Sequence, residues 1–372
     1  MEILPDYTLV IPTFNRPLLL KRLLSFIASK QTTFKIVVVD SSENSIIKMN
    51  KKLCEVLDLS ITYIQYPPET APVPKVLDGL RRVTTKYASI CADDDLLFID
   101  TIPECLNFLE ASTDYVACHG YYINFGNNEN GEYDIGLEYS ASSLDGETFE
   151  KRIFQLLNNY QAISYAIFKA SVMVDYVEAA LNIEPYAYIE LFTGIAPLIS
   201  GKVKRLPLCY HARARQTSVS SHDNPRWNSN LWFADDPDAF VQEFVKYRER
   251  LKIFIIERSG YKIEDLDKLL SLLHAIYVFK SFDLSYIQRI VQRYFKIEPL
   301  TSQKDKMAFM RSLQHCVNTL YRKIFLGKPF IRRKANPKGS ITFTISKNIA
   351  RSVVNQSVLI DLQNYLLGLD EV

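Results

Sequence analysis

Several motifs and segment types are missing from this 372-residue sequence, and each absence argues against a class of protein. No GxGxxG motif follows the first predicted strand and no GxxxxGKS/T motif occurs anywhere, which argues against dinucleotide-dependent oxidoreductases and P-loop NTPases. No apolar run reaches the ~20 residues that a membrane-spanning helix needs. The six cysteines are scattered and form no CxxC pair, so we expect reduced core residues in a cytoplasmic protein.

Acidic residues are absent from one long part of the chain. Between Lys306 and Ile360 there are eleven Lys or Arg residues and no Asp or Glu, although the whole chain has a formal charge of only +2. Such segregation predicts a basic surface that faces something anionic. We expect residues 306–351 to attach the protein to an anionic membrane. We do not expect nucleic acid as a partner, because no nucleic-acid-binding motif accompanies the charge.

Apolar strands alternate with amphipathic helices through the N-terminal half. Leu and Ile at helical spacing predict a helix over 17–29, and Pro17 suits its first position. The alternation predicts an α/β fold with a mostly parallel sheet and right-handed crossovers. The expected order is strand 7–12, helix 17–29, strand 34–39, helix 44–58, strand 60–66, a helix after the Pro-rich loop 67–74, and a strand from Tyr87.

Polar side chains gather where three of these strands end. Because the carboxyl ends of neighbouring parallel strands meet at one edge of a sheet, we expect these residues to line one pocket. Three adjacent carboxylates repel one another. A divalent cation is the usual compensation, whereas capping the next helix needs only one Asp. The residues are Thr13 to Arg16 after the first strand, Asp40 at the end of the second, and the Asp triplet (Asp93, Asp94 and Asp95) after the fourth.

Three motifs in this order resemble a family 2 glycosyltransferase of the GT-A fold. They are TLVIPTFNRP at 8–17, IVVVDSS at 36–42 and the Asp triplet, and the similarity covers roughly residues 5–215. The resemblance implies inverting transfer of a sugar from a nucleotide diphosphate donor, with a UDP-sugar favoured, to a hydroxyl acceptor. It also implies a Mg²⁺ or Mn²⁺ cofactor. By the same resemblance, Thr13, Asn15, Arg16 and Asp40 would hold the nucleoside, and Asp93 and Asp95 the cation.

Two positions depart from the family pattern. Many members read Asp-Ala-Asp-Asp where this chain has Ala92 followed by the Asp triplet, so the pair that acts as Asp-x-Asp is open by one position. Asp94 is accordingly a further nucleotide-binding candidate. Ser41 and Ser42 replace the usual acidic pair after Asp40, which leaves open which nucleotide base the donor carries.

Three basic side chains are candidates for the phosphate or metal site. Lys75 follows the Pro-rich loop and either contacts the phosphates or is a solvated lysine. His211 and Arg213 come after a predicted strand at 202–210. An imidazole can join carboxylates on a divalent cation and a guanidinium matches phosphate oxygens, whereas the alternative for both residues is a surface role.

Glu190 is the candidate general base. It is the only carboxylate in the aromatic stretch 186–192, and burial among apolar groups raises the pKa of a carboxyl toward neutrality. Inverting members of the family have an acidic base at about this point in the chain. The alternative is a structural ion pair with Lys or Arg.

The chain is expected to contain two domains. Residues 1–234 form the GT-A domain, in which an antiparallel half from about residue 115 contacts the acceptor, and a polar stretch at 218–230 is a candidate lid. Acidic residues and a proline at 235–238 mark the boundary. Residues 235–372 form a mainly helical accessory domain with the basic tail.

Analogy suggests a growing bacterial surface glycan, lipid-linked or free, as the acceptor, with the enzyme cytoplasmic or peripheral on the inner face of the plasma membrane. Two other functions stay open. A sugar-phosphate nucleotidyltransferase shares the nucleotide-binding sheet and the metal carboxylate, but it normally has a Gly-rich loop where this chain has Thr13 to Arg16. A non-catalytic module that binds a nucleotide sugar is the second alternative.

Overall fold

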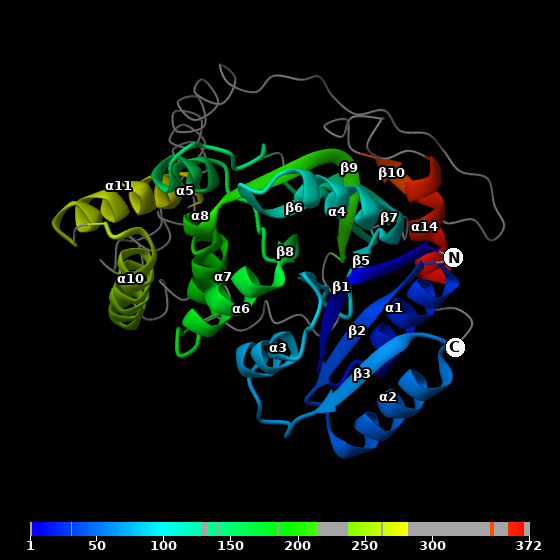
Figure 1. Cartoon of the computed structure of the whole chain (residues 1–372). Helices are drawn as coiled ribbons and strands as arrows, with labels where there is room; N and C mark the ends of the chain where they lie inside the picture. The colour runs from blue at the N-terminus through cyan, green and yellow to red at the C-terminus, as the bar shows by residue number, and fades with distance from the viewer. Residues whose placement is uncertain are drawn as a thin grey trace, which may run out of the picture.

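The computed structural model describes residues 2–30, 32–127, 133–139, 141–184, 186–214, 237–261, 263–281, 343–345 and 356–367 (Figure 1). The predicted lid at 218–230, residues 235 and 236 of the predicted boundary, and the basic segment except 343–345 lie outside this part of the chain. No described helix is both long and apolar enough to cross a bilayer.

The N-terminal elements confirm the predicted alternation. Helix α1 begins at Pro17, whose missing N–H costs nothing at the first helical position, and it buries its Leu-rich face. The elements are β1 (Glu2–Thr13), α1 (Pro17–Ser29), β2 (Thr32–Asp40), α2 (Asn44–Val56), β3 (Ser60–Gln65), α3 (Pro72–Arg81) and β4 (Tyr87–Ile90).

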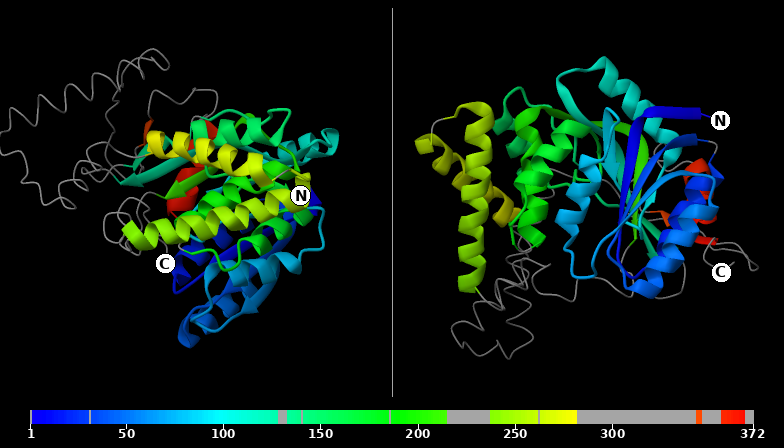
Figure 2. Two further views of the ribbon diagram at one scale, coloured as in Figure 1. Left: turned by 90° about the vertical axis from the view of Figure 1, so that its left-hand side faces the viewer. Right: turned by 60° about the horizontal axis from the view of Figure 1, so that its bottom comes forward.

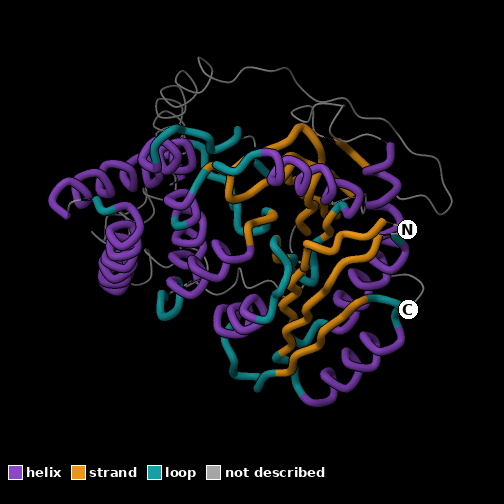
Figure 3. Tube along the Cα trace, in the orientation of Figure 1, coloured by secondary structure: helices purple, strands orange, loops and turns teal. Residues whose placement is uncertain are grey.

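The chain then leaves strict alternation, as predicted. Figure 3 shows the strands running through the middle of the molecule with helices on either side. The elements are β5 (Leu96–Leu97), η1 (Ile99–Thr101), α4 (Ile102–Ala111), β6 (Tyr115–Asn127), β7 (Tyr133–Leu137), α5 (Phe149–Asn158), β8 (Ile167–Lys169), α6 (Ala170–Ala179), α7 (Tyr186–Ile195), α8 (Pro197–Ser200) and β9 (Lys202–Ala214).

The described strands form one mixed sheet in the order β10-β7-β6-β8-β4-β1-β2-β3, in which β10 is Phe343–Ile345, and β9 pairs with both β5 and β6. Strands β4, β1, β2 and β3 are parallel neighbours. Strand β8 is antiparallel to both β4 and β6, so it joins the parallel half to the second half. This is the α/β architecture expected from the sequence. The carboxyl ends of β1, β2 and β4 therefore lie at one edge.

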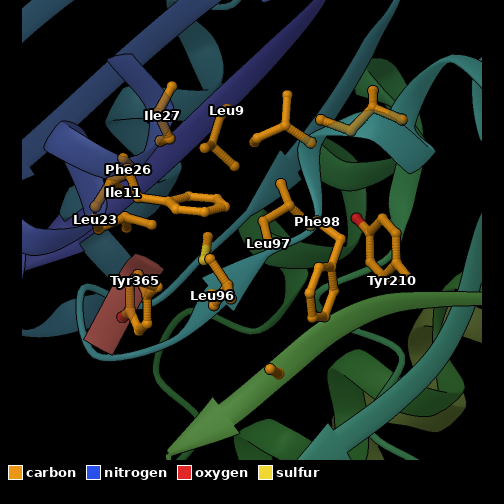
Figure 4. Packing of buried hydrophobic residues seen from close by; sticks show 14 of the residues in the cluster. Leu9, Ile11, Leu23, Phe26, Ile27, Leu96, Leu97, Phe98, Tyr210 and Tyr365 are labelled. Atoms are coloured by element: carbon orange, nitrogen blue, oxygen red, sulfur yellow. The ribbon is translucent and has the colours of Figure 1, made fainter. Parts of the chain in front are cut away.

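The central strands are buried on both faces, which explains their near-continuous apolar sequence. Leu9 and Ile11 of β1 join a core cluster with α1, α4 and the C-terminal helix, whereas Val10 between them joins a second cluster with α3, α5, α6 and α7. Strand β2 alternates in the same way. Figure 4 shows the first cluster, in which side chains of α1 meet those of β1 and β5. The five cysteines described are free and buried, as expected.

The later helices occupy two separate places. Helices α10 (Pro237–Ser259) and α11 (Ile263–Ser281) pack beside α5, α7 and α8, away from β1–β3 (Figure 2). Strand β10 (Phe343–Ile345) instead pairs with β7, and helix α14 (Gln356–Leu367) packs on α1. Two segments assigned to the C-terminal domain thus contact the N-terminal half, and the division at residue 235 stays a prediction.

Candidate active site

Hydrogen bonds of Asn15 connect the loop after β1 to the loop after β2. Its backbone N–H donates to Ser42 Oγ at 2.7 Å, and its side-chain Oδ1 accepts from the N–H of Glu43 at 2.9 Å. Asn15 has φ +53°, a conformation that Asn tolerates better than most residues. The predicted nucleoside-binding segment is therefore a rigid pair of loops rather than two independent ones.

Asp40 lies beneath these loops and is fully buried. Its carboxylate accepts hydrogen bonds from the Ser42 N–H at 2.8 Å, Asn50 Nδ2 at 2.8 Å and the Tyr63 hydroxyl at 2.6 Å. A buried charge needs such donors. Asp40 is thus at the predicted edge, but its oxygens are already engaged in holding the loop.

Lys75 braces the same two loops from α3. Its side chain is 3 % exposed, and Nζ donates to the Thr13 carbonyl and to Ser41 Oγ, both at 2.7 Å. Burial lowers the pKa of Lys75 to about 8, although the negative charges of Asp40 and Asp93 oppose the shift. The alternative of a solvated surface lysine is wrong, because the helix packs this residue into the protein.

The Asp triplet directly faces the first loop. Asp93 accepts from the Thr13 hydroxyl at 2.7 Å, and Arg16 Nη1 lies 3.1 Å from a carboxylate oxygen of Asp93 and of Asp94. Asp95 points to the other side, where its Oδ1 accepts from the Ala214 N–H at 3.0 Å. The structure thus brings together the predicted residues Thr13, Arg16 and the triplet.

The triplet holds negative charge that its neighbours only partly offset. Burial and the adjacent charge of Asp94 raise the pKa of Asp93 to about 6, against the opposing effects of Arg16 and Thr13. Burial and Asp94 also raise the pKa of Asp95 to about 8, and Arg213 opposes this shift. Ionising both carboxyls is therefore costly without further positive charge.

Carboxylate oxygens are the donors that Mg²⁺ and Mn²⁺ prefer, so the chemistry of the triplet fits a divalent cation. Among the described residues, however, no three His, Cys, Asp or Glu side chains are already arranged around a common ion position. The carboxylate oxygens are thus the right kind of ligand for a divalent cation, but they are not already arranged around one ion position.

His211 and Arg213 lie within β9, not beyond its end, so that part of the prediction is wrong. Strand β9 continues to Ala214 because it pairs with β6 and, antiparallel, with β5. Leu96 pairs with Ala212 and Leu97 with His211. Since β5 begins directly after the triplet, this ladder sets His211 and Arg213 next to Asp95.

His211 is fully buried and stacks on Tyr165 with ring centroids 4.9 Å apart. Burial, with Arg213 nearby, lowers the pKa of His211 to about 3, so the imidazole is neutral at physiological pH. Its Nε2 lies 3.6 Å from Asp95 Oδ2. A neutral imidazole beside a carboxylate is suited to share a cation with it. The surface alternative for His211 is wrong.

Arg213 connects the triplet to the second half of the site. Its Nη1 donates to the Tyr139 hydroxyl at 2.9 Å and lies 3.3 Å from a carboxylate oxygen of Glu138. Burial opposes its charge, but Tyr165, Tyr139 and the carboxylates of Asp95 and Glu138 outweigh burial and raise the pKa of Arg213. Its guanidinium is therefore a fixed, half-buried cation rather than a surface arginine.

Glu190 lies on α7 and is partly buried. The Tyr160 hydroxyl donates to its carboxylate at 3.2 Å, and Tyr160 in turn packs edge-on against Tyr277. Within the described part of the chain this carboxylate forms no ion pair, so the Lys or Arg partner of the structural alternative is not found there. A tyrosine-oriented carboxylate can accept a proton from a hydroxyl.

Comparison with protein-family models identifies the domain that contains the Asp triplet and the loops facing it. Residues 8–176, which span β1 to α6, match the model described as glycosyl transferase family 2. The chain is a glycosyltransferase with a family 2 domain. Both the Asp triplet and the loops that face it fall inside the match, whereas Glu190, His211 and Arg213 follow it.

Solved structures similar to this glycosyltransferase include S. aureus TarS 1–349, with 12 % identity, a TM-score of 0.48, and coverage of 86 % of this chain and 82 % of that one. TarS 1–349 in complex with UDP-GlcNAc gives 14 % identity, a TM-score of 0.48, and 84 % and 81 % coverage. The mannosyltransferase PcManGT from Pyrobaculum calidifontis in complex with GDP-Man and Mn²⁺ gives 13 % identity, a TM-score of 0.40, and coverage of 86 % of this chain and 88 % of that one. The search of curated proteins found no match.

Sequence reasoning missed several residues of this glycosyltransferase site. Tyr139 accepts a hydrogen bond from Arg213, Tyr165 stacks on His211, and Tyr160 donates to Glu190. Their only sequence signal is the abundance of tyrosine, which is equally typical of a core. Arg22 and Tyr365, which bond the backbone of the triplet, gave no signal at all, because Tyr365 lies 270 positions beyond Asp95.

Proposed function

We propose that this glycosyltransferase transfers a sugar with inversion from a nucleotide diphosphate donor, with a UDP-sugar favoured, to a hydroxyl of a glycan acceptor. The observation that supports this proposal most is the position of the Asp triplet. The buried carboxyl groups of Asp93 and Asp95 have raised pKa values and lie between Arg16 and the pair His211 and Arg213. A divalent cation with a diphosphate would complete this charge arrangement.

Asp93 and Asp95, with His211, would hold Mg²⁺ or Mn²⁺. When bound, the cation would neutralise charge that develops on the diphosphate as the glycosidic bond breaks. Arg16 and Arg213 flank the triplet and supply further positive charge at fixed positions. The braced loops after β1 and β2 would receive the nucleoside, with Thr13 and Asn15 at their edge and Asp40 and Lys75 keeping their shape.

Glu190 would be the general base. Its carboxylate would take the proton of the acceptor hydroxyl as the hydroxyl oxygen bonds to the anomeric carbon. The bond from that carbon to the diphosphate oxygen breaks on the opposite face, and the nucleoside diphosphate leaves with the electron pair. Tyr160 holds the carboxylate in place for this step.

Product analysis tests this function against its two alternatives. With UDP-sugars, Mn²⁺ and glycan acceptors, we expect release of UDP and formation of a glycoside of inverted configuration. Pyrophosphate release from UTP and a sugar phosphate would instead indicate a nucleotidyltransferase. Donor binding without any turnover, including hydrolysis, would indicate a binding module. Asp95→Asn should reduce turnover by about a hundredfold or more.

We also propose that the acceptor belongs to bacterial surface polysaccharide and that residues 306–351 attach the enzyme to the inner face of the plasma membrane. The eleven Lys and Arg residues without an acidic one support this, since each basic residue near an anionic bilayer contributes about 1 kcal/mol. Vesicle co-sedimentation at low salt tests it. Changing Arg332, Arg333 and Lys334 together to Glu should release the protein from anionic vesicles, and unchanged binding would exclude attachment by this segment.

A further inference from the structure

The C-terminal helix α14 is hydrogen-bonded directly to the backbone of the Asp triplet. The Tyr365 hydroxyl lies 2.8 Å from the Asp95 carbonyl oxygen and 3.2 Å from that of Asp94. Arg22 of α1 donates from Nη2 to the same Asp94 carbonyl at 3.0 Å. One side chain from each of two helices thus bonds the peptide groups of the predicted metal site.

The hydrogen bonds from Arg22 and Tyr365 hold the peptide groups on both sides of Asp95. The Asp94 carbonyl belongs to the peptide group before the Asp95 Cα, and the Asp95 carbonyl belongs to the one after it. Because each peptide group is planar, fixing both carbonyls fixes both backbone dihedral angles of Asp95. The direction in which its side chain leaves the backbone is then fixed as well.

Tyr365 is itself tightly held. Its side chain is 1 % exposed, and its ring packs edge-on against Phe26 and Phe125 with centroid distances of 5.8 and 6.1 Å (Figure 4 shows it beside Phe26 and Leu96). The Arg22 guanidinium lies 4.1 Å from the ring centroid, so it contacts both the ring and the triplet. The hydroxyl therefore reaches the carbonyls from a ring with little freedom to move.

An ion pair fixes the other end of the helix contact. Lys30, just after α1, lies 2.8 Å from a carboxylate oxygen of Asp361, one turn before Tyr365 on α14, and also pairs with the exposed Asp100. Both groups of the Lys30–Asp361 pair are mostly buried. Helix α14 is thus attached to α1 by charge and to the Asp triplet by hydrogen bonds.

We propose that Tyr365 is a positioning residue for Asp95, so that the last described helix of the chain sets the geometry of the cation and diphosphate site at the end of the fourth strand. This inference rests on the proposed function for the consequence but not for the positioning itself. Positioning is visible in the protein without any ligand, and the consequence is visible in cation and nucleotide binding.

The test compares Tyr365→Phe with Tyr247→Phe in the full-length chain. Tyr365→Phe keeps the ring, its packing and the Arg22 contact and removes only the hydroxyl. Tyr247→Phe is the matched control, because it also removes one buried hydroxyl, which bonds His274 Nε2 at 2.8 Å between α10 and α11. Both variants should lose similar global stability.

Two measurements are made on each protein. Amide hydrogen exchange of residues 93–97 in the ligand-free protein should be about five- to tenfold faster in Tyr365→Phe and unchanged in Tyr247→Phe. Titration with Mn²⁺ alone, then with UDP at saturating Mn²⁺, should show affinities about five- to tenfold weaker in Tyr365→Phe only. Equal exchange and equal affinity in the two variants would overturn the proposal.

A charge swap supplies the second variant. In an Asp100→Asn background, which removes the other carboxylate beside Lys30, Asp361→Lys should weaken Mn²⁺ binding, and adding Lys30→Asp should restore it, since the swap re-forms the pair between α1 and α14. Failure of the swap to restore binding would overturn the role of the helix contact. Faster exchange in Tyr365→Phe together with a wild type that binds neither Mn²⁺ nor UDP would support the positioning but refute the proposed function.

Discussion

The two sides of this site satisfy their charges in opposite ways. On the side of β1 and β2, Asp40 receives three hydrogen bonds and Lys75 donates two, so each buried charge already has protein partners. On the side of β4 and β9, burial and mutual repulsion raise the carboxyl pKa values of Asp93 and Asp95 to about 6 and 8. The hydrogen bonds of the first side fix its shape, whereas the second side contains carboxyl groups that a bound cation would help to ionise.

The largest expected loss of turnover comes from a residue outside both sides, the proposed general base Glu190. Glu190→Gln should reduce turnover by about 10²–10⁴-fold and leave donor affinity nearly unchanged, because an amide cannot accept the acceptor proton. Turnover and donor affinity, measured by calorimetry, separate the two effects. The control is Glu184→Gln, the same chemical change at an exposed position outside the site. A large loss of donor affinity in Glu190→Gln would reassign Glu190 to the donor pocket.

Asp40→Asn should change stability more than cation binding. The amide group cannot accept from all three donors, so the free energy of unfolding should fall by about 2 kcal/mol. Denaturant unfolding measures that loss, and titration with Mn²⁺ should give an affinity within about twofold of the wild type. If Asp40→Asn were as stable as the wild type, the β1–β2 side would not depend on this network.

Lys75 makes a smaller, pH-dependent contribution. Its pKa in the folded protein is about 8, below the unfolded value of 10.5, so the unfolded chain holds this proton more tightly. The cost of burying the charge is complete below pH 8 and disappears as the pH rises to 10.5. Wild type should therefore gain on the order of 2 kcal/mol relative to Lys75→Met across that window. Parallel stability curves for the two proteins would contradict the buried, charged lysine.

Much of this architecture follows from local patterns in the sequence. The helix that begins at Pro17 and the strand that begins at Tyr87 were predictable, because proline placement and the alternation of strands and helices act over short distances. The parallel order also brings strand ends together, which made it predictable that Arg16 and the Asp triplet lie at one edge of the sheet.

The remaining features depend on tertiary packing, which residue order alone does not reveal. Lys75 is buried because α3 packs on β1 and β2, and nothing in its neighbours distinguishes it from a solvated lysine. His211 lies in a strand because β9 pairs with both β5 and β6, which come far earlier in the chain. Tyr365 reaches the triplet through a helix at the far end of the chain.

The most direct test of the contrast between the two sides is the thermal stabilisation that Mn²⁺ gives to three proteins. A ligand that binds the folded state raises the unfolding midpoint by an amount that grows with the logarithm of one plus the ratio of ligand concentration to Kd. Mn²⁺ should raise the midpoint of the wild type and of Asp40→Asn by similar amounts and should barely change that of Asp95→Asn. A full Mn²⁺ shift in Asp95→Asn, or its loss in Asp40→Asn alone, would contradict the account.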